Sequence, residues 1–211
     1  MIKKESVILV LAPHTDDGEF GCGASLSRWI EEGKAVYYVA FSSAEKSVPP
    51  GLPKDILKRE VVKATKVLGV SPKNLILLNY PVREFPTYRQ DILEDMIKLG
   101  NNLKPNMILL PSTSDTHQDH QTVSNEGFRA FKKITILGYE MPHNNLTFTT
   151  NMFVSLNDCH LNKKIEALEC YDSQKSRNCA SADFIRSLAT IRGTQVGIKY
   201  AEAFEVIRWV M

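Results

Sequence analysis

Imidazole and carboxylate groups, two kinds of side chain that bind zinc, occur together in two short segments of this sequence. The first segment reads His-Thr-Asp-Asp over residues 14–17, and the second reads His-Gln-Asp-His over residues 117–120. A catalytic zinc ion takes three ligands from the protein and keeps a fourth position open for water. His14, Asp17 and His120 can supply such a set, so the two segments together predict a catalytic metal site.

Each segment alone also has an ordinary structural explanation. A single histidine after a strand is usually a polar surface or capping group, and Asp16-Asp17 alone fits a helix N-cap with an acidic first turn. His143 and His160 are interpreted in this way, as surface or loop histidines. Two independent turns rarely both collect imidazole and carboxylate by chance, so the catalytic interpretation depends on the fold bringing the two segments together.

Both histidine segments follow apolar stretches that are typical of buried strands. The stretches with this pattern are residues 7–11, 35–41, 74–78, 107–110 and 134–139. Continuous apolar strands that alternate with helices indicate a parallel sheet covered on both faces, and right-handed crossovers bring the carboxyl ends of the strands to one edge. We therefore expect an α/β, Rossmann-like three-layer sandwich with a mostly parallel sheet, helices on both faces and the active site at the C-terminal edge of the strands.

Helical spacing of apolar residues separates these strands and continues beyond them. The expected helices are residues 24–32, 54–68, 90–103, 123–131, 162–171 and 183–191, and two further strands are expected at 152–156 and 203–210. The glycine-rich segment 18–23 is expected to be a turn. Residues 42–53 and 80–88 carry several prolines after strands, and the first of these is a candidate lid or substrate loop.

The composition limits the classes to which this protein can belong. The chain has 211 residues, 43% of them hydrophobic, which is enough for one substantial core and one domain. Its 26 basic and 24 acidic residues form no stripe that would bind nucleic acid. The four cysteines contain no CxxC pair, which fits a reduced compartment. No stretch approaches the roughly 20 apolar residues of a membrane helix, so we expect a cytoplasmic protein without a membrane span.

The two histidine segments also carry a family resemblance. Residues 13–19, PHTDDGE, resemble the PHPDDxE signature of the LmbE-like (PIG-L) N-acetylglucosaminyl deacetylases, and residues 115–120, DTHQDH, resemble their second motif, DxHxDH. Residues 164–174, together with Arg192-Gly193 and residues 200–204, YAEAF, resemble further segments of the family. The resemblance covers nearly the whole chain and implies a single LmbE-like deacetylase domain over residues 1–211.

The resemblance implies a specific division of roles among these residues. The implied ligands of one zinc ion per chain are His14, Asp17 and His120. Asp16 is then the general base that takes a proton from the attacking water, and His117 stabilises the oxyanion and protonates the leaving amine, with Asp119 orienting His117. These roles agree with general chemistry, because a carboxylate beside a metal can accept a water proton and a histidinium supplies charge where the oxyanion develops.

The implied reaction is the removal of an N-acyl group, expected to be acetyl, from an amino sugar that is free, nucleotide-linked or lipid-linked. The sequence departs from the family pattern at Leu57, where family members often carry a sugar-contacting arginine, and residues 80–86 lack an aspartate that is common there. Arg83, Arg89 and Gln174 are the candidate substrate-binding residues instead. Relatives of this fold are often oligomeric, so a homo-oligomer is compatible with the resemblance, and the sequence alone leaves the oligomeric state open.

Two other classes of protein remain as alternatives. A signalling receiver domain also carries an acidic pair after its first strand, but it needs a phosphate-accepting aspartate after the third strand, where this chain has Leu78-Asn79-Tyr80. A non-catalytic metal- or sugar-binding module that retains the fold is the second alternative. Metal content and a screen of N-acetyl sugars would separate this module from an enzyme.

Overall fold

A single seven-stranded sheet runs through the protein, in the order β3-β2-β1-β4-β5-β7-β6. The computed structural model describes residues 6–175 and 178–211. The strands are β1 (Val7–Ala12), β2 (Ala35–Ala40), β3 (Leu75–Leu77), β4 (Met107–Pro111), β5 (Thr135–Tyr139), β6 (Met152–Leu156) and β7 (Tyr200–Arg208). The α-helices are α1 (Asp17–Glu31), α2 (Ile56–Leu68), α3 (Arg89–Leu103), α4 (Gln118–Ala130), α5 (Asp158–Glu169) and α6 (Ala182–Thr194).

The first five strands are parallel, as their continuous apolar sequences predicted. β1 pairs with β2 and β4, β2 pairs with β3, and β4 pairs with β5, all in parallel register. β7 then runs antiparallel to β5, and β6 runs antiparallel to β7. The prediction of a mostly parallel sheet is therefore confirmed.

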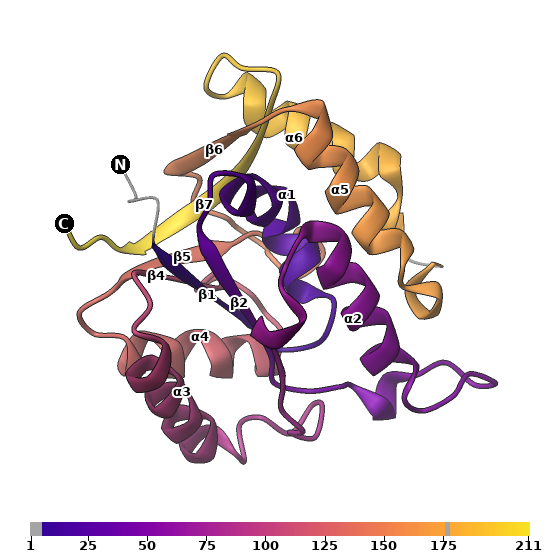
Figure 1. The fold of residues 1–211 in the computed structure, drawn as a ribbon, viewed down its shortest axis with the longest axis vertical. Coiled ribbons are helices and arrows are strands. Elements are labelled where there is room, and N and C mark those ends of the chain that lie inside the picture. The colour runs from indigo at the N-terminus through magenta and orange to yellow at the C-terminus, as the bar shows by residue number, and fades with distance from the viewer. Residues whose placement is uncertain (1–5, 176–177) are drawn as a thin grey trace.

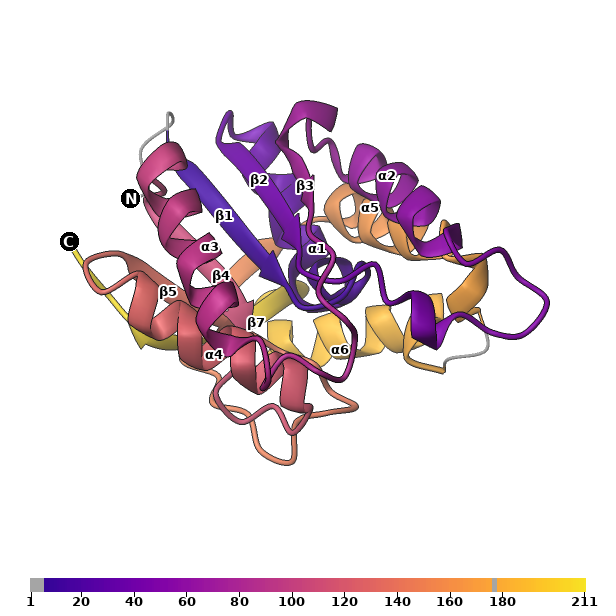
Figure 2. The same cartoon turned by 90° about the horizontal axis from the view of Figure 1, so that it is seen from below.

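Helices cover both faces of the sheet (Figures 1 and 2). Side chains of a strand alternate between the two faces, so Ile8 and Val10 of β1 belong to one apolar core and Leu9 and Leu11 to the other. The first core is closed by α1, α2, α5 and α6, and the second by α3 and α4. The predicted three-layer arrangement is confirmed. The prediction of one domain over residues 1–211 includes residues 1–5 and 176–177, which lie outside the described part.

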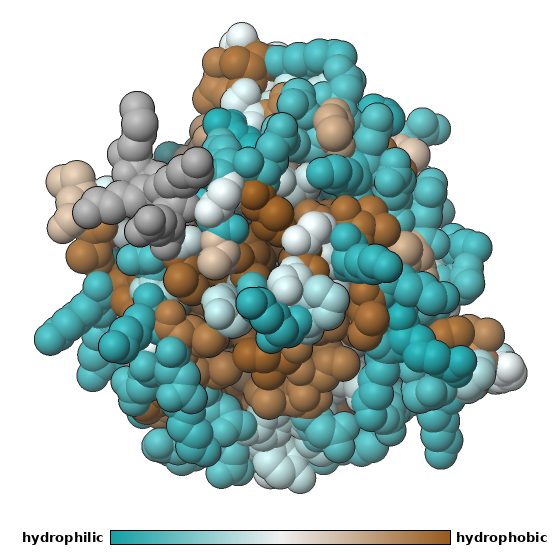
Figure 3. Space-filling view, viewed as in Figure 1, coloured by the Kyte–Doolittle hydropathy of each residue, from teal (hydrophilic) through white to brown (hydrophobic). Residues whose placement is uncertain are grey.

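The surface is mixed in character. In the orientation of Figure 1, apolar side chains gather in the middle of the face and hydrophilic side chains surround them (Figure 3). Among the described residues, no helix has both the length and the apolar character needed to cross a membrane.

Three helices begin several residues earlier than the sequence pattern predicted: α1 at Asp17, α4 at Gln118 and α5 at Asp158, where starts at residues 24, 123 and 162 were expected. Residues 18–23 were expected to be a turn, but they belong to α1, because two of their glycines allow close packing. A Cβ atom on Gly18 would lie 2.5 Å from the ring of Tyr38, and one on Gly21 would lie 2.2 Å from the ring of Tyr139. α4 begins at Gln118 instead of residue 123, so the second histidine segment forms the start of a helix.

Candidate active site

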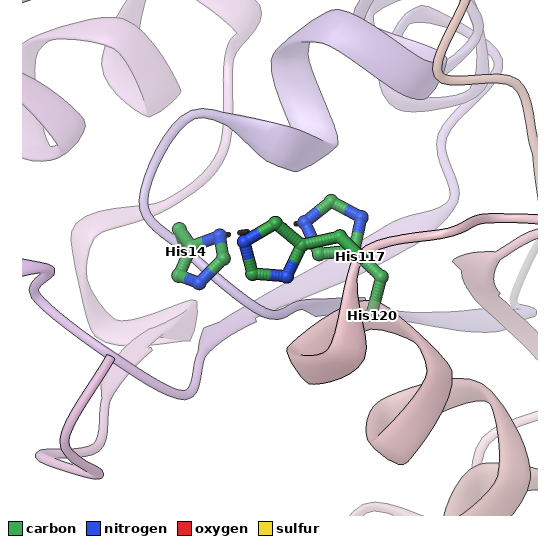
Figure 4. A group of neighbouring side chains, drawn as sticks. All are labelled: His14, His117 and His120. Carbon is green, nitrogen blue, oxygen red and sulfur yellow. Dashed lines mark hydrogen bonds between the residues drawn. The ribbon is translucent and has the colours of Figure 1, made fainter. Parts of the chain in front are cut away.

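The two histidine segments meet where β1 and β4 end. These strands are hydrogen-bonded neighbours, so the segments that follow them leave the sheet side by side. His14 lies between β1 and α1, while His117 is the N-cap of α4 and His120 lies in its first turn. Figure 4 shows the three imidazole rings gathered in one space, with His14 on one side and the residues of α4 on the other.

Three potential ligand atoms form a tight triangle in this space. The distance from His14 Nδ1 to Asp17 Oδ2 is 3.1 Å, and the distance from His120 Nε2 to the same oxygen is 3.2 Å. The two imidazole nitrogens are 3.4 Å apart. His117 offers a further nitrogen, and the ligand atoms of the three histidines lie within 4.8 Å of one another, so this group can hold a metal ion.

The second nitrogen of each close histidine is held by a buried carboxylate. His14 Nε2–H donates to Asp119 Oδ2 at 3.0 Å, and His120 Nδ1–H donates to Asp115 Oδ2 at 2.7 Å. Asp119 and Asp115 are 0% and 1% exposed. Such carboxylates fix the tautomer and orientation of a metal-binding imidazole. The sequence analysis did not assign a role to Asp115, although its position at the start of the second motif was a usable signal.

Asp119 contacts a different histidine from the one that was expected. The sequence analysis assigned it to orient His117, but its carboxylate binds His14 and accepts backbone N–H groups from Arg83 at 2.6 Å and Phe85 at 3.2 Å. The hydrogen bond between Asp119 and His117 is made by the backbone N–H of Asp119, which donates to Nδ1 at 3.1 Å. The Asp119 carboxylate thus connects His14 to the loop before α3.

The charges in this cluster shift one another strongly. Burial alone would lower the pKa of His14, but the carboxylates of Asp17 and Asp119 outweigh burial and raise this pKa to about 9. Burial opposes charge on His120 as well, and the carboxylates of Asp17 and Asp115 raise its pKa to about 10. For Asp17, burial favours the neutral acid, yet His120 and His14 hold its pKa well below the usual range.

His117 behaves differently from the other two histidines. Burial, together with the positive charges of His120 and His14, lowers the pKa of His117. Its Nδ1 accepts the N–H of Asp119, so the neutral ring carries its proton on Nε2. The sequence analysis expected a histidinium here, whereas these contacts favour a neutral imidazole that donates from Nε2.

A cavity of about 850 Å³, its open mouth included, lies over this cluster. Five of the six residues predicted for metal binding and catalysis line the cavity, and Asp119 lies buried behind His14. Arg83 and Gln174 also line it. Arg89 does not, because its Nε–H donates to Glu126 at 2.9 Å outside the cavity. His143, interpreted from sequence as a surface or loop residue, lines the same cavity.

Glu19 lies buried beneath the turn that carries the first motif. Its carboxylate accepts the hydroxyl of Tyr38 and, at 3.0 Å, that of Tyr171. The same two hydroxyls lie 3.0 and 2.7 Å from the carbonyl oxygen of Thr15. Burial raises the pKa of Glu19 to about 8. Glu19 is therefore part of a network that supports the turn at residues 14–17, and it is not among the residues that line the cavity.

Comparison with known proteins gives matches over most of the chain. The model of the family described as GlcNAc-PI de-N-acetylase (PIG-L) matches residues 9–131. The uncharacterised deacetylase YaiS of Escherichia coli K12 is 30% identical over 178 residues, which cover 81% of this chain and 92% of YaiS.

Solved structures resemble the whole fold. The N,N'-diacetylchitobiose deacetylase of Pyrococcus horikoshii has a TM-score of 0.80 at 21% identity, covering 96% of this chain and 84% of its own. GalB, the 4-carboxy-2-hydroxymuconate hydratase of Pseudomonas putida KT2440, has a TM-score of 0.74 at 18% identity, covering 98% of each chain. These likenesses establish the fold alone, since a deacetylase and a hydratase both carry it.

The family match shows more than the fold, because it is a match of sequence. It spans more than half of the chain and includes both histidine segments. The resemblance of these segments to the two family motifs is thereby confirmed. The chain belongs to the GlcNAc-PI de-N-acetylase family, PIG-L, whose members are also called LmbE-like.

Proposed function

We propose that this protein is a zinc-dependent amidohydrolase that removes an N-acyl group, in the simplest case acetyl, from an amino sugar or an amino-sugar conjugate. The observation that carries this proposal is the convergence of His14, Asp17 and His120 on one point of a cavity that Asp16 and His117 also line. Membership of a family of deacetylases supports the same reaction.

The spacing of the proposed ligands fits zinc. A tetrahedral ion with bonds of about 2.0–2.1 Å holds its ligand atoms about 3.3–3.4 Å apart. The three distances among His14 Nδ1, Asp17 Oδ2 and His120 Nε2 are 3.1, 3.2 and 3.4 Å. A set in which His117 replaces Asp17 is looser, since its atoms are only within 4.8 Å of one another. We therefore assign one zinc ion per chain to the first set.

The two adjacent aspartates have different tasks in this proposal. When bound, zinc supplies Lewis-acid chemistry, which lowers the pKa of water to near 7 and polarises a carbonyl group. The carboxylate of Asp17 lies between the ring nitrogens of His14 and His120, as a metal ligand would, and Asp16 lines the same cavity. Asp16 takes a proton from the attacking water as the general base.

His117 is proposed to stabilise the oxyanion that forms when water attacks the amide carbonyl. With its Nδ1 occupied by the Asp119 N–H, the neutral ring donates from Nε2–H to the developing negative charge. A neutral imidazole is a very weak acid, so the proton that the leaving amine needs returns from Asp16. This changes the assignment made from sequence, in which His117 also protonated the amine.

The sugar is proposed to contact Arg83 and Gln174, which line the cavity together with Leu57. Arg89 is left out of the proposal because it pairs with Glu126 outside the cavity. The proposed substrate is an amino sugar or an amino-sugar conjugate, with the acyl amide directed toward His14 and His120.

The test compares Asp16→Asn with the wild-type protein. We expect about one zinc per chain in both proteins, acetate release from N-acetyl sugars or nucleotide sugars by the wild type, and a loss of about 10²-fold or more in kcat for the variant. Unchanged turnover in Asp16→Asn would refute the assignment of the base. Wild-type protein that binds zinc but cleaves no acyl amide would instead favour the non-catalytic binding module.

A further inference from the structure

Helix α1, whose first residue is the proposed ligand Asp17, is broken in its middle. Cys22 has φ −147° and ψ 15°, which lies outside the helical region. The break separates a short first part, which carries Asp17, from a longer second part that ends at Glu31. A break of this kind leaves carbonyl and N–H groups without their helical partners, so these groups need other partners when they are buried.

A buried ion pair is inserted at the break. In an uninterrupted helix the N–H of Ala24 would donate to the carbonyl of Phe20. Instead, Lys164 Nζ donates to Phe20 O at 2.7 Å, and Glu202 Oε1 accepts from Ala24 N at 3.2 Å. Glu202 Oε2 accepts from Ser25 N at 2.7 Å, and the two charged groups are 2.6 Å apart. The ion pair thus takes the place of a helical hydrogen bond.

The two charges come from elements distant in sequence. Lys164 belongs to α5 and Glu202 to β7, and their side chains are 6% and 8% exposed. The ammonium meets a carbonyl at the end of the first part, and the carboxylate meets N–H groups at the start of the second part, so both match the helix dipoles. A buried pair of this kind is often no more stabilising than apolar residues of the same size, so stability alone does not account for it.

The first part of α1 is tightly seated, which makes its direction important for the metal site. Gly18 and Gly21 press it against the rings of Tyr38 and Tyr139. At its start, Asp17 Oδ2 accepts the N–H of His14 at 2.8 Å and lies 3.2 Å from His120 Nε2. A small rotation of this short segment about its far end would displace the Asp17 carboxylate from the triangle of ligand atoms.

We propose that Lys164 and Glu202 are positioning residues for the metal site: they hold the break in α1 and thereby fix the direction from which Asp17 reaches the metal. This inference rests on the metal site of the proposed function, and it does not depend on which sugar is the substrate.

The test is the double variant Lys164→Met/Glu202→Gln, which leaves no buried charge without its partner. We expect it to fold, with a far-UV circular dichroism spectrum like that of the wild type. Its zinc affinity, measured by competition with a chelator, should fall about 10- to 100-fold, the range seen when a residue that orients a ligand is lost. The visible absorption of the Co²⁺-substituted protein should also change, because a displaced carboxylate alters the coordination geometry.

Glu31→Gln is the matched control. Glu31 also lies on α1 and pairs with His160 of α5 at 2.6 Å, but beyond the break. The Glu31→Gln variant should therefore have the zinc affinity and the Co²⁺ spectrum of the wild type. If the double variant does not fold, Glu202→Asp decides, because it keeps both charges but is one methylene too short to reach Lys164 and both N–H groups together.

A folded double variant, or Glu202→Asp, with wild-type zinc affinity and an unchanged Co²⁺ spectrum would overturn the inference and leave the pair a structural role only. Equal losses in Glu31→Gln would overturn it too. Wild-type protein that binds no metal would instead refute the proposed function, so the two failures are distinguishable.

Discussion

Replacing Asp115 by asparagine should weaken metal binding while leaving the fold intact. The Asp115 carboxylate is 1% exposed, accepts His120 Nδ1–H at 2.7 Å and accepts the N–H of His117 at 2.8 Å. Asparagine has nearly the same shape and can keep one of these two bonds through its oxygen. It carries no negative charge, so the His120 ring becomes a poorer electron donor.

The magnitude follows from the role of carboxylates that orient metal-binding imidazoles. Their loss typically costs 10- to 100-fold in metal affinity, which corresponds to about 1.4–2.7 kcal/mol at 25 °C. Asp119→Asn is the matched variant, since it removes the equivalent carboxylate from His14. We expect a similar loss of zinc affinity in both proteins.

The two variants should differ in substrate binding. Asp119 also accepts the N–H groups of Arg83 and Phe85, and Arg83 has φ 71°, a conformation that costs a non-glycine residue about 1 kcal/mol or more. Asp119→Asn should therefore raise KM as well, while Asp115→Asn should not. Chelator competition and steady-state kinetics with saturating zinc measure the two effects. Zinc affinity within twofold of wild type in Asp115→Asn would refute the reasoning.

Three further changes have expected outcomes. Replacing His117 by glutamine should lower kcat about 10²- to 10³-fold at unchanged zinc content, because an oxyanion donor is misplaced; equal kcat would contradict its role. Zinc binding at pH 7 should release about two protons, because His14 and His120 have pKa values of about 9 and 10 in the metal-free protein and bind metal only when neutral. Zinc affinity should accordingly rise with pH, and calorimetry in buffers of different ionisation enthalpy counts the protons; a count near zero would contradict these pKa values. Gly21→Ala should destabilise the fold by about 1–3 kcal/mol in urea unfolding, because its Cβ would lie 2.2 Å from the Tyr139 ring; unchanged stability would show that the ring moves freely.

The sheet and the meeting of the two histidine segments could be predicted because both depend on simple patterns. Continuous apolar strands indicate parallel pairing, and parallel pairing brings the residues after β1 and β4 to one edge. The prediction that His14 and His120 lie together needed no further information. The family assignment also needed no further information, because it depends on the same two motifs.

The details that were missed depend on contacts between distant residues. Residues 18–23 form a helix because Tyr38 and Tyr139 pack where side chains would otherwise stand, and no local pattern reports those rings. The partner of Asp119 depends on the loop at residues 83–85, which directs its carboxylate toward His14. His143 is an exposed turn residue, as expected, but its place at the cavity depends on the contact of its loop with the second motif, where the N–H of Thr116 donates to the carbonyl of Asn144 at 3.2 Å.

Contacts between distant residues also explain why neither motif alone could form the proposed metal site. Within the proposed ligand set, His14 and His120 are 106 residues apart in the chain. His14 is held by Asp119 of α4, and the part of α1 that carries Asp17 ends at an ion pair supplied by α5 and β7. His14 and Asp17 are thus both held by contacts with elements that lie outside the first motif. The ligand geometry is therefore a property of the closed three-layer fold, and partial opening of any one layer should release the metal.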